Sequence, residues 1–199
     1  MNLACLEKFT SDFVIRLMPQ ANKTYVRRYW PAVYMALDEA DLDYEEMMLM
    51  ALATIAAEAG DFDITVREYI SRYNTSEEAR AAGHYFDMYD GREDLGNRGA
   101  PDGFKYRGGG AVQLTGRYNY GEIGKALGLP LEDKPELIEN PVVSARALAL
   151  FLSRRKMEIN SALRNKDYGK ARRLVNGGAH GLDEFQSTYL RGLRLIGKG

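Results

Sequence analysis

The chain has 199 residues, of which 45% are hydrophobic and 28% are charged, and this is the composition of an ordinary globular protein. A formal net charge of −1 argues against a protein held to nucleic acid by bulk charge, and the single cysteine, Cys5, excludes an internal disulfide. Charged residues interrupt the N-terminus, and no apolar run reaches the roughly 18 residues of a membrane span. The sequence therefore predicts a soluble protein made in the cytoplasm without a signal peptide.

The first forty residues have helical periodicity. Apolar residues recur at three- and four-residue steps and predict one amphipathic helix, at Leu3, Leu6, Phe9, Phe13 and Leu17. Pro19 stops this pattern, and a second one over residues 25–40 is bent or restarted at Pro31. Trp30 and Tyr34 are expected to anchor the core, as is Cys5.

The strongest helical signal is "DLDYEEMMLMALATIAAEAG", residues 41–60. Asp43 is a candidate N-cap, Glu45 and Glu46 suit the first turn, and Gly60 suits the end of the helix. Residues 83–110 then lose the helical period and are rich in Gly, Asp and aromatic residues. We expect loops with short strands there, forming the wall of a cleft.

Helical patterns return after residue 110. The ranges are 117–127, 142–163, 167–175 and 182–196. The whole sequence predicts a mainly α, lysozyme-like single domain over residues 1–199, with two helical lobes, a cleft and an irregular middle.

Glu58 ends the apolar helix. The positions on its face, at three- and four-residue steps, are Met47, Ala51, Thr54 and Ile55. An apolar surrounding and the negative end of the helix dipole both favour the protonated carboxyl group, which a general acid needs. The alternative is a glutamate that frays into solvent at the last turn.

Glu68 follows ten residues later, beyond a polar turn. By itself it is a weak signal, because polar segments contain many carboxylates. Two carboxylates across a cleft are the recurring pair of glycoside hydrolases, in which one protonates the leaving oxygen and the other activates water or attacks directly.

Three further motifs are "AEAGDF" around Glu58, "YRGGGAVQLTGRYNYGEIGKALG" and "RRLVNGGAHGLDEF". In this order they resemble family 19 glycoside hydrolases, which comprise plant-type chitinases and related phage and bacterial cell-wall lysins. The stretches "FDMYDGREDLGN" and "PDGFKYRG" are similar to the lysin branch. The resemblance covers residues 18–189.

This resemblance implies a lysozyme-like fold and hydrolysis, with inversion, of a β-1,4 bond beside an N-acetylated sugar. Glu58 matches the general acid, Glu68 the water-activating base, and Thr115 a hydroxyl that holds the attacking water. The matches to sugar-binding positions are Gln113, Tyr118, Asn119 and Asn176. No cofactor and no metal is implied.

The sequence departs from the family pattern at several positions. The family usually has Arg in place of Gly109, Thr or Ser in place of Ala59, and a second glycine in place of Asp61. The spacing from Glu58 to Glu68 is one residue longer than is usual in bacterial members. Other candidates for the base are Glu77, Glu78 and Asp87.

Two other groups of residues carry weaker functional signals. His84, Asp87 and Asp90 lack the spacing of an EF-hand or zinc motif, so surface loop residues are the better interpretation, and His180 is best read as a loop histidine. The basic clusters are Arg154, Arg155 and Lys156, and Arg172 and Arg173. Each is read as a solvated helix face, with weak attraction to an anionic cell envelope as the alternative.

The sequence thus predicts a monomeric peptidoglycan hydrolase of the endolysin type, acting on the cell wall after release. A chitinase is the alternative within the class, so the partner is a peptidoglycan or chitin strand and not nucleic acid. A non-catalytic glycan-binding protein with a degenerate site is the alternative from another class.

Overall fold

The computed structural model describes residues 3–176 and 181–198, and the regular secondary structure of these residues is almost entirely helical. The α-helices are α1 (Leu3–Lys8), α2 (Ser11–Leu17), α3 (Lys23–Glu39), α4 (Glu45–Glu58), α5 (Glu77–Ala81), α6 (Asp87–Asp90), α7 (Asp102–Lys105), α8 (Arg117–Leu127), α9 (Pro141–Arg154), α10 (Lys156–Arg164), α11 (Tyr168–Asn176) and α12 (Leu182–Leu195). Two short 3-10 helices are η1 (Glu93–Leu95) and η2 (Pro135–Glu139). Within the described ranges, none of the helices is both long and apolar enough to cross a membrane.

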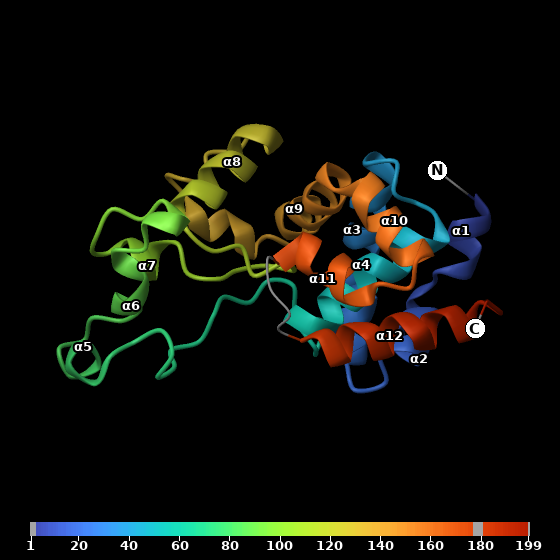
Figure 1. Cartoon of the computed structure of the whole chain (residues 1–199), viewed down its shortest axis with the longest axis horizontal. Coiled ribbons are helices and arrows are strands. Elements are labelled where there is room, and N and C mark those ends of the chain that lie inside the picture. The colour runs from blue at the N-terminus through green and yellow to red at the C-terminus, as the bar shows by residue number, and fades with distance from the viewer. Residues whose placement is uncertain (1–2, 177–180, 199) are drawn as a thin grey trace.

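The helices form two lobes, as predicted. Figure 1 shows α1–α4 and α9–α12 gathered in a larger lobe that holds both chain ends, with α5, α6, α7 and α8 extending away from it. α9 contacts α3 and α4 on one side and α8 on the other, so it joins the lobes. The mainly α prediction is confirmed.

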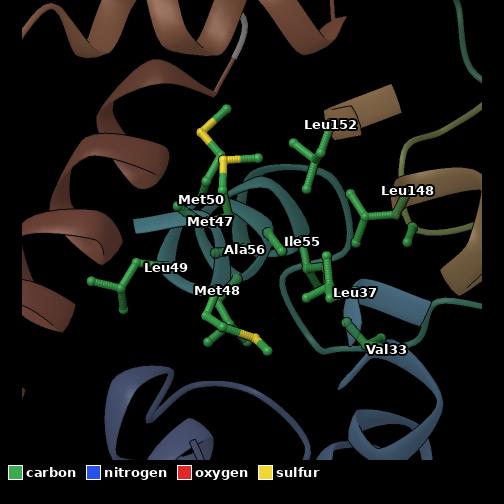
Figure 2. Close-up of a cluster of buried hydrophobic side chains, with 14 of the residues drawn as sticks. Val33, Leu37, Met47, Met48, Leu49, Met50, Ile55, Ala56, Leu148 and Leu152 are labelled. Atoms are coloured by element: carbon green, nitrogen blue, oxygen red, sulfur yellow. The ribbon is translucent and has the colours of Figure 1, made fainter. Parts of the chain in front are cut away.

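α4 is the centre of the larger lobe. All ten residues from Met47 to Ala56 are buried, so this helix is apolar on every face, as expected of a helix enclosed by others. Figure 2 shows its side chains radiating toward α3, at Val33 and Leu37, and toward α9, at Leu148 and Leu152. α12 packs along another side of α4. The last residue of α4, Glu58, is therefore held on a rigid element.

The N-terminal helices differ from the predicted ones. The first is split into α1 and α2, because the Thr10 side chain accepts a hydrogen bond from the Phe13 amide at 3.2 Å and begins a new helix. α3 continues through Pro31 without restarting. Pro31 has no backbone N–H, so the Arg27 carbonyl one turn earlier loses its helical hydrogen bond. Both residues are exposed, so water can donate to that carbonyl. Trp30 is buried, and its indole donates to the Phe9 carbonyl oxygen at 2.7 Å.

Other predicted helix ends were also corrected. Tyr44, not Asp43, is the N-cap of α4. The long helix predicted for residues 142–163 is broken into α9 and α10 at Arg155, whose φ of −122° and ψ of 17° leave the helical region. The pattern did not reveal this break, because both segments bury their apolar faces in the same core. The helix predicted over 117–127 is confirmed as α8, and Gly128 ends it in the left-handed conformation.

The middle of the chain contains short helices instead of the predicted short strands. Among the described residues, the only extended pairing is an isolated antiparallel bridge between Arg67 and Gly109. Side-chain hydrogen bonds take the place of a sheet here. Arg117 makes a two-pronged contact with Asp102, at 2.6 and 2.9 Å, and also reaches Glu132 at 3.1 Å. The Asn97 side chain accepts from the Arg117 amide at 2.9 Å, which caps α8.

Candidate active site

Glu58 lies at the C-terminal end of α4, where its side chain is 12% exposed. Nη2 of Arg172, from α11, donates a hydrogen bond of 2.5 Å to Oε1 of Glu58. The Arg172 side chain is fully buried. The predicted apolar stripe beside Glu58 is confirmed, since Met47, Ala51 and Ile55 are all buried.

Arg172 was predicted to lie on a solvated basic face, and that prediction is wrong for this residue. It shares the buried face of α11 with Tyr168 and Val175, at four and three residues' distance, whereas Arg173 is exposed. The periodicity of α11 could have identified it. The sequence-based argument placed Glu58 beside apolar residues alone and did not include this buried guanidinium.

A tight turn carries the chain from Glu58 toward Glu68. The Asp61 carboxylate accepts from the Asp63 amide at 3.0 Å, and the Asp63 carboxylate accepts from the Thr65 amide at 3.1 Å. Phe62 takes a left-handed φ of 69° and is fully buried, so the core fixes this strained position. Asp61, where the family often has glycine, thus supports the turn through its side chain.

Three contacts attach this segment to the glycine-rich loop 107–116. The Glu68 amide donates to the Gly108 carbonyl at 2.7 Å, and the Gly110 amide donates to the Val66 carbonyl at 3.0 Å. Ser144 of α9, fully buried, donates to the Ile64 carbonyl at 2.6 Å and accepts from the Ala111 amide at 2.8 Å. The backbone that carries Glu68 is therefore fixed to the loop and to α9.

The Glu68 carboxylate accepts hydrogen bonds from neutral groups. Oε1 accepts from Nδ2 of Asn74 at 2.8 Å and from the Tyr89 hydroxyl at 3.0 Å. Oε2 accepts only a long hydrogen bond, 3.4 Å, from the Gly108 amide. Among the described residues Glu68 makes no ion pair, in contrast to Glu58.

The glycine-rich loop brings Gln113 to Glu68. A Cβ placed on Gly108 would stand 2.9 Å from Oε1 of Gln113 and 3.2 Å from Oε2 of Glu68, so any larger residue would require these side chains to shift. Gln113 has a left-handed φ of 47°, and its Nε2 donates to the Gly110 carbonyl at 3.1 Å. Such a strained conformation persists only where surrounding contacts hold it, and it is common at functional sites.

Gly109 occupies the position where the family usually has arginine. A Cβ there would lie 2.8 Å from Ile138 and 3.0 Å from the Tyr120 hydroxyl. Across the bridge, Arg67 donates to the carbonyl of Lys105 at 2.7 Å, and its guanidinium lies 5.9 Å from the Tyr120 ring centroid. A guanidinium from the paired segment therefore holds this loop.

Thr115 and Asn119 lie where the loop enters α8. The Thr115 hydroxyl donates to the Gln113 carbonyl at 2.9 Å. Nδ2 of Asn119 donates to the Thr115 carbonyl at 2.8 Å, which leaves its Oδ1 as an acceptor. Both side chains are half-buried.

Glu58, Gln113, Thr115 and Asn119 line one cavity of about 610 Å³. It is lined by Glu58, Tyr89, Leu95, Val112, Gln113, Leu114, Thr115, Asn119, Phe151 and Val175. Glu68 lies just behind the lining, since Tyr89, which donates to it, and Gln113, which lies beside it, both face the cavity. The cavity joins α4 of the larger lobe to the loop and α8 of the smaller one.

One predicted sugar-binding residue, Tyr118, is not brought to this cavity. Tyr118 is 62% exposed and lines a separate cavity of about 410 Å³ with Arg98, Arg117 and Lys125. Asn176 ends α11, and its side chain lies outside the described residues, as does His180.

Like Glu68, the other candidates for the base do not line the cavity, but Glu68 accepts a hydrogen bond from the lining residue Tyr89. Glu77 and Glu78 are exposed in the first turn of α5. The Asp87 carboxylate accepts from the Ser76 amide at 2.8 Å, and hydrogen bonds from Ser76 hold the pKa of Asp87 below its usual range. Among the described residues, no cluster of three potential metal ligands exists. His84 instead contacts Asp90 at 2.6 Å.

Sequence reasoning missed Asn74 and Tyr89 as well as Arg172. Asn74 is fully buried, although it lies in an irregular polar segment, and Tyr89 sits on a helix of a single turn. Neither position has a periodic pattern that could have revealed its contact with Glu68.

Comparison with known proteins identifies the family of this chain. The family model described as Chitinase class I, glycoside hydrolase family 19, matches residues 52–177. A glycosyl hydrolase family 19 domain-containing protein of Haemophilus influenzae is 33% identical over 103 residues, which are 51% of this chain and 48% of that protein. An endochitinase of Arabidopsis thaliana is 35% identical over 77 residues, 38% of this chain and 26% of that protein. The chain thus spans half or less of the length of these curated relatives.

A crystal structure of a bacterial family 19 chitinase has the same fold. The TM-score is 0.61 at 22% sequence identity, with 96% of this chain and 95% of that chain covered. The matched range of the family model includes both carboxylates and the loop between residues 107 and 116. The chain belongs to glycoside hydrolase family 19, the class I chitinases.

Proposed function

We propose that this protein hydrolyses β-1,4 glycosidic bonds in a chitin-like glycan of N-acetylated sugars. The observation that carries the proposal is the cavity that Glu58 lines, with Glu68 held behind it by Tyr89 and beside Gln113. The match to the class I chitinase family and the similarity to an endochitinase support chitin as the substrate.

In the proposed reaction the Glu58 carboxyl group gives its proton to the glycosidic oxygen. The bond between that oxygen and the anomeric carbon breaks, and its electron pair stays with the departing sugar. A water molecule attacks the anomeric carbon from the opposite face while Glu68 takes one of its protons, so the configuration inverts. Glu68 is suited to this role because it accepts hydrogen bonds from the neutral side chains of Asn74 and Tyr89 and, among the described residues, forms no salt bridge.

Other residues of the cavity would bind substrate. Gln113 and Asn119 present amide groups that can pair with sugar hydroxyl and acetamido groups. The Thr115 hydroxyl lies beside Gln113 and would help to hold the attacking water. Leu95, Val112 and Phe151 supply apolar surface for the faces of the sugar rings.

Peptidoglycan is the second candidate substrate. The observation that favours it is the segment "FDMYDGREDLGN", which resembles the lysin branch of the family and places Tyr89 and Leu95 in the cavity wall. The comparisons support chitin better, since the family model is described as Chitinase class I and the Arabidopsis thaliana relative is an endochitinase.

Digestion of both glycans in parallel tests the proposal. The N-acetylglucosamine hexamer and purified peptidoglycan would be incubated with the protein and with Glu58→Gln, and products identified by mass spectrometry. We expect shorter oligomers from the hexamer and none with the variant. Muropeptides with an intact hexamer would establish the peptidoglycan function, and binding of either glycan without cleavage would establish a non-catalytic glycan-binding protein.

A further inference from the structure

Asn74 is oriented unambiguously toward Glu68. Its Oδ1 accepts from the Ser71 amide at 2.9 Å and from the Thr75 hydroxyl at 3.0 Å. A backbone N–H can only donate, so the oxygen must face Ser71 and the amide nitrogen must face the other way. That nitrogen donates one proton to the Tyr69 carbonyl at 3.0 Å and the other to Oε1 of Glu68 at 2.8 Å. A fully buried amide with all these bonds made cannot turn away.

Tyr89 reaches the same oxygen from a different element. Its hydroxyl donates to Oε1 of Glu68 at 3.0 Å, while its backbone carbonyl accepts from Asn97 at 2.7 Å. Asn97 also caps α8, so the position of Tyr89 is tied to the start of the helix that carries Asn119. Burial and the Glu68 charge raise the pKa of Tyr89 to about 12, so its phenol remains a donor at neutral pH.

The two oxygens of Glu68 are therefore not equivalent. Oε1 accepts two hydrogen bonds from neutral donors of fixed orientation. Among the described residues, Oε2 accepts only the 3.4 Å contact from the Gly108 amide, and it lies on the side of Gln113, which lines the cavity. A carboxylate oxygen can accept at about two positions, so Oε2 keeps accepting capacity that Oε1 has used.

We infer that Asn74 and Tyr89 are positioning residues that fix the Glu68 carboxylate so that Oε2 is the atom that takes the proton of the attacking water. The inference rests on the proposed function, because it specifies how the base of that reaction is held. Both residues act through Glu68, and their donated hydrogen bonds stabilise its charged form over its protonated form.

Two titratable side chains that interact electrostatically with Glu68 are Tyr89 and Arg107. Arg107 remains charged across the working pH range, so it contributes a constant attraction. Removing the Tyr89 hydroxyl therefore takes away one hydrogen bond to Glu68 and leaves the Arg107 charge in place.

The test compares Tyr89→Phe with Tyr69→Phe. Both remove one hydroxyl from a tyrosine near Glu68, but Tyr69 is 78% exposed and only its backbone contacts Asn74. Titration of the Glu68 side-chain carbon by ¹³C NMR, assigned with Glu68→Gln, needs no turnover. We expect the midpoint to rise by about one pH unit in Tyr89→Phe, because a donor to the charged form is lost, and to stay unchanged in Tyr69→Phe.

Kinetics with the N-acetylglucosamine hexamer complete the test. In Tyr89→Phe the acidic limb of kcat against pH should move upward by the same amount, with kcat lowered about tenfold at acidic pH and KM unchanged. An NMR midpoint equal to that of the wild type would overturn the positioning role even in an active enzyme. A moved midpoint with an unmoved acidic limb would overturn Oε2 as the base. A protein that cuts no glycan would overturn the proposed function itself, which the NMR titration does not depend on.

Discussion

Arg172, fully buried on α11, donates a hydrogen bond of 2.5 Å to Glu58 at the end of α4. The pair joins α4 and α11 of the larger lobe, and Glu58 lines the cavity. It also gives the two carboxylates of the site different surroundings, since Glu58 faces a fixed cation and Glu68 faces neutral donors.

Glu58→Gln should reduce kcat for hexamer hydrolysis by about a thousandfold or more, because the amide has no proton to transfer to the glycosidic oxygen. The free energy of unfolding should fall by about 2 kcal/mol, since Arg172 keeps an acceptor but loses the opposite charge. Hydrolysis rates and urea unfolding measure the two effects. Near-normal hydrolysis by this variant would remove Glu58 as the acid.

Arg172→Lys should lower both stability and activity. Lysine is shorter, cannot reproduce the planar guanidinium contact, and brings a strongly hydrated charge into a fully buried position, so we expect a loss of about 3 kcal/mol in unfolding free energy. Arg173→Lys is the matched control, because Arg173 is the exposed neighbour and should change stability by no more than about 0.5 kcal/mol. Equal stability of the two variants would contradict the structural role of the ion pair.

Gly108→Ala should reduce kcat at least about tenfold, because its Cβ would push Gln113 and Glu68 from their positions, and small displacements at a reacting centre are costly. Gly91→Ala is the control, since nothing lies within 4 Å of a Cβ there and its φ is −93°. Steady-state kinetics of the two variants give the comparison. Full activity in Gly108→Ala would mean that Glu68 and Gln113 need not lie as close as they do.

In Asp102→Asn the free energy of unfolding should depend less on pH in the acidic range. Burial alone would raise the pKa of Asp102, but the hydrogen bonds from Arg117 and from the Arg98 amide outweigh it and hold the pKa below its usual range. The folded value is thus lower than the unfolded value of about 3.9, so the stabilisation is fully present above that pH and is lost as the pH falls through the folded value.

At pH 7 the variant should lose about 3 kcal/mol of unfolding free energy, because Arg117 loses its buried partner. Urea unfolding at several pH values would show the difference from the wild type shrinking below about pH 4. A difference that stays constant down to pH 2 would show that the charge of Asp102 is not what stabilises α7 against α8.

The regular helices could be read from the sequence because burial imposes a period on them. Gly128 marked the end of α8, and the apolar face of α4 led to Glu58. Arg172 was within reach of the same argument, since it shares a helix face with Val175. Asn74 and Tyr89 were not, because their segment is fixed by hydrogen bonds between residues far apart in the chain and leaves no repeating pattern. The split at Thr10 depended on one side-chain cap that the apolar period concealed.

The central claim is that Glu58 and Glu68 act as an acid and a base on opposite sides of one glycosidic bond. The most direct measurement is ¹H NMR of the N-acetylglucosamine hexamer during the first minutes of cleavage, which identifies the anomer released before mutarotation. We predict that the α-anomer appears first, as direct attack by water on a β-linked sugar requires. Initial release of the β-anomer, or no cleavage by a folded protein that binds the hexamer, would contradict the claim.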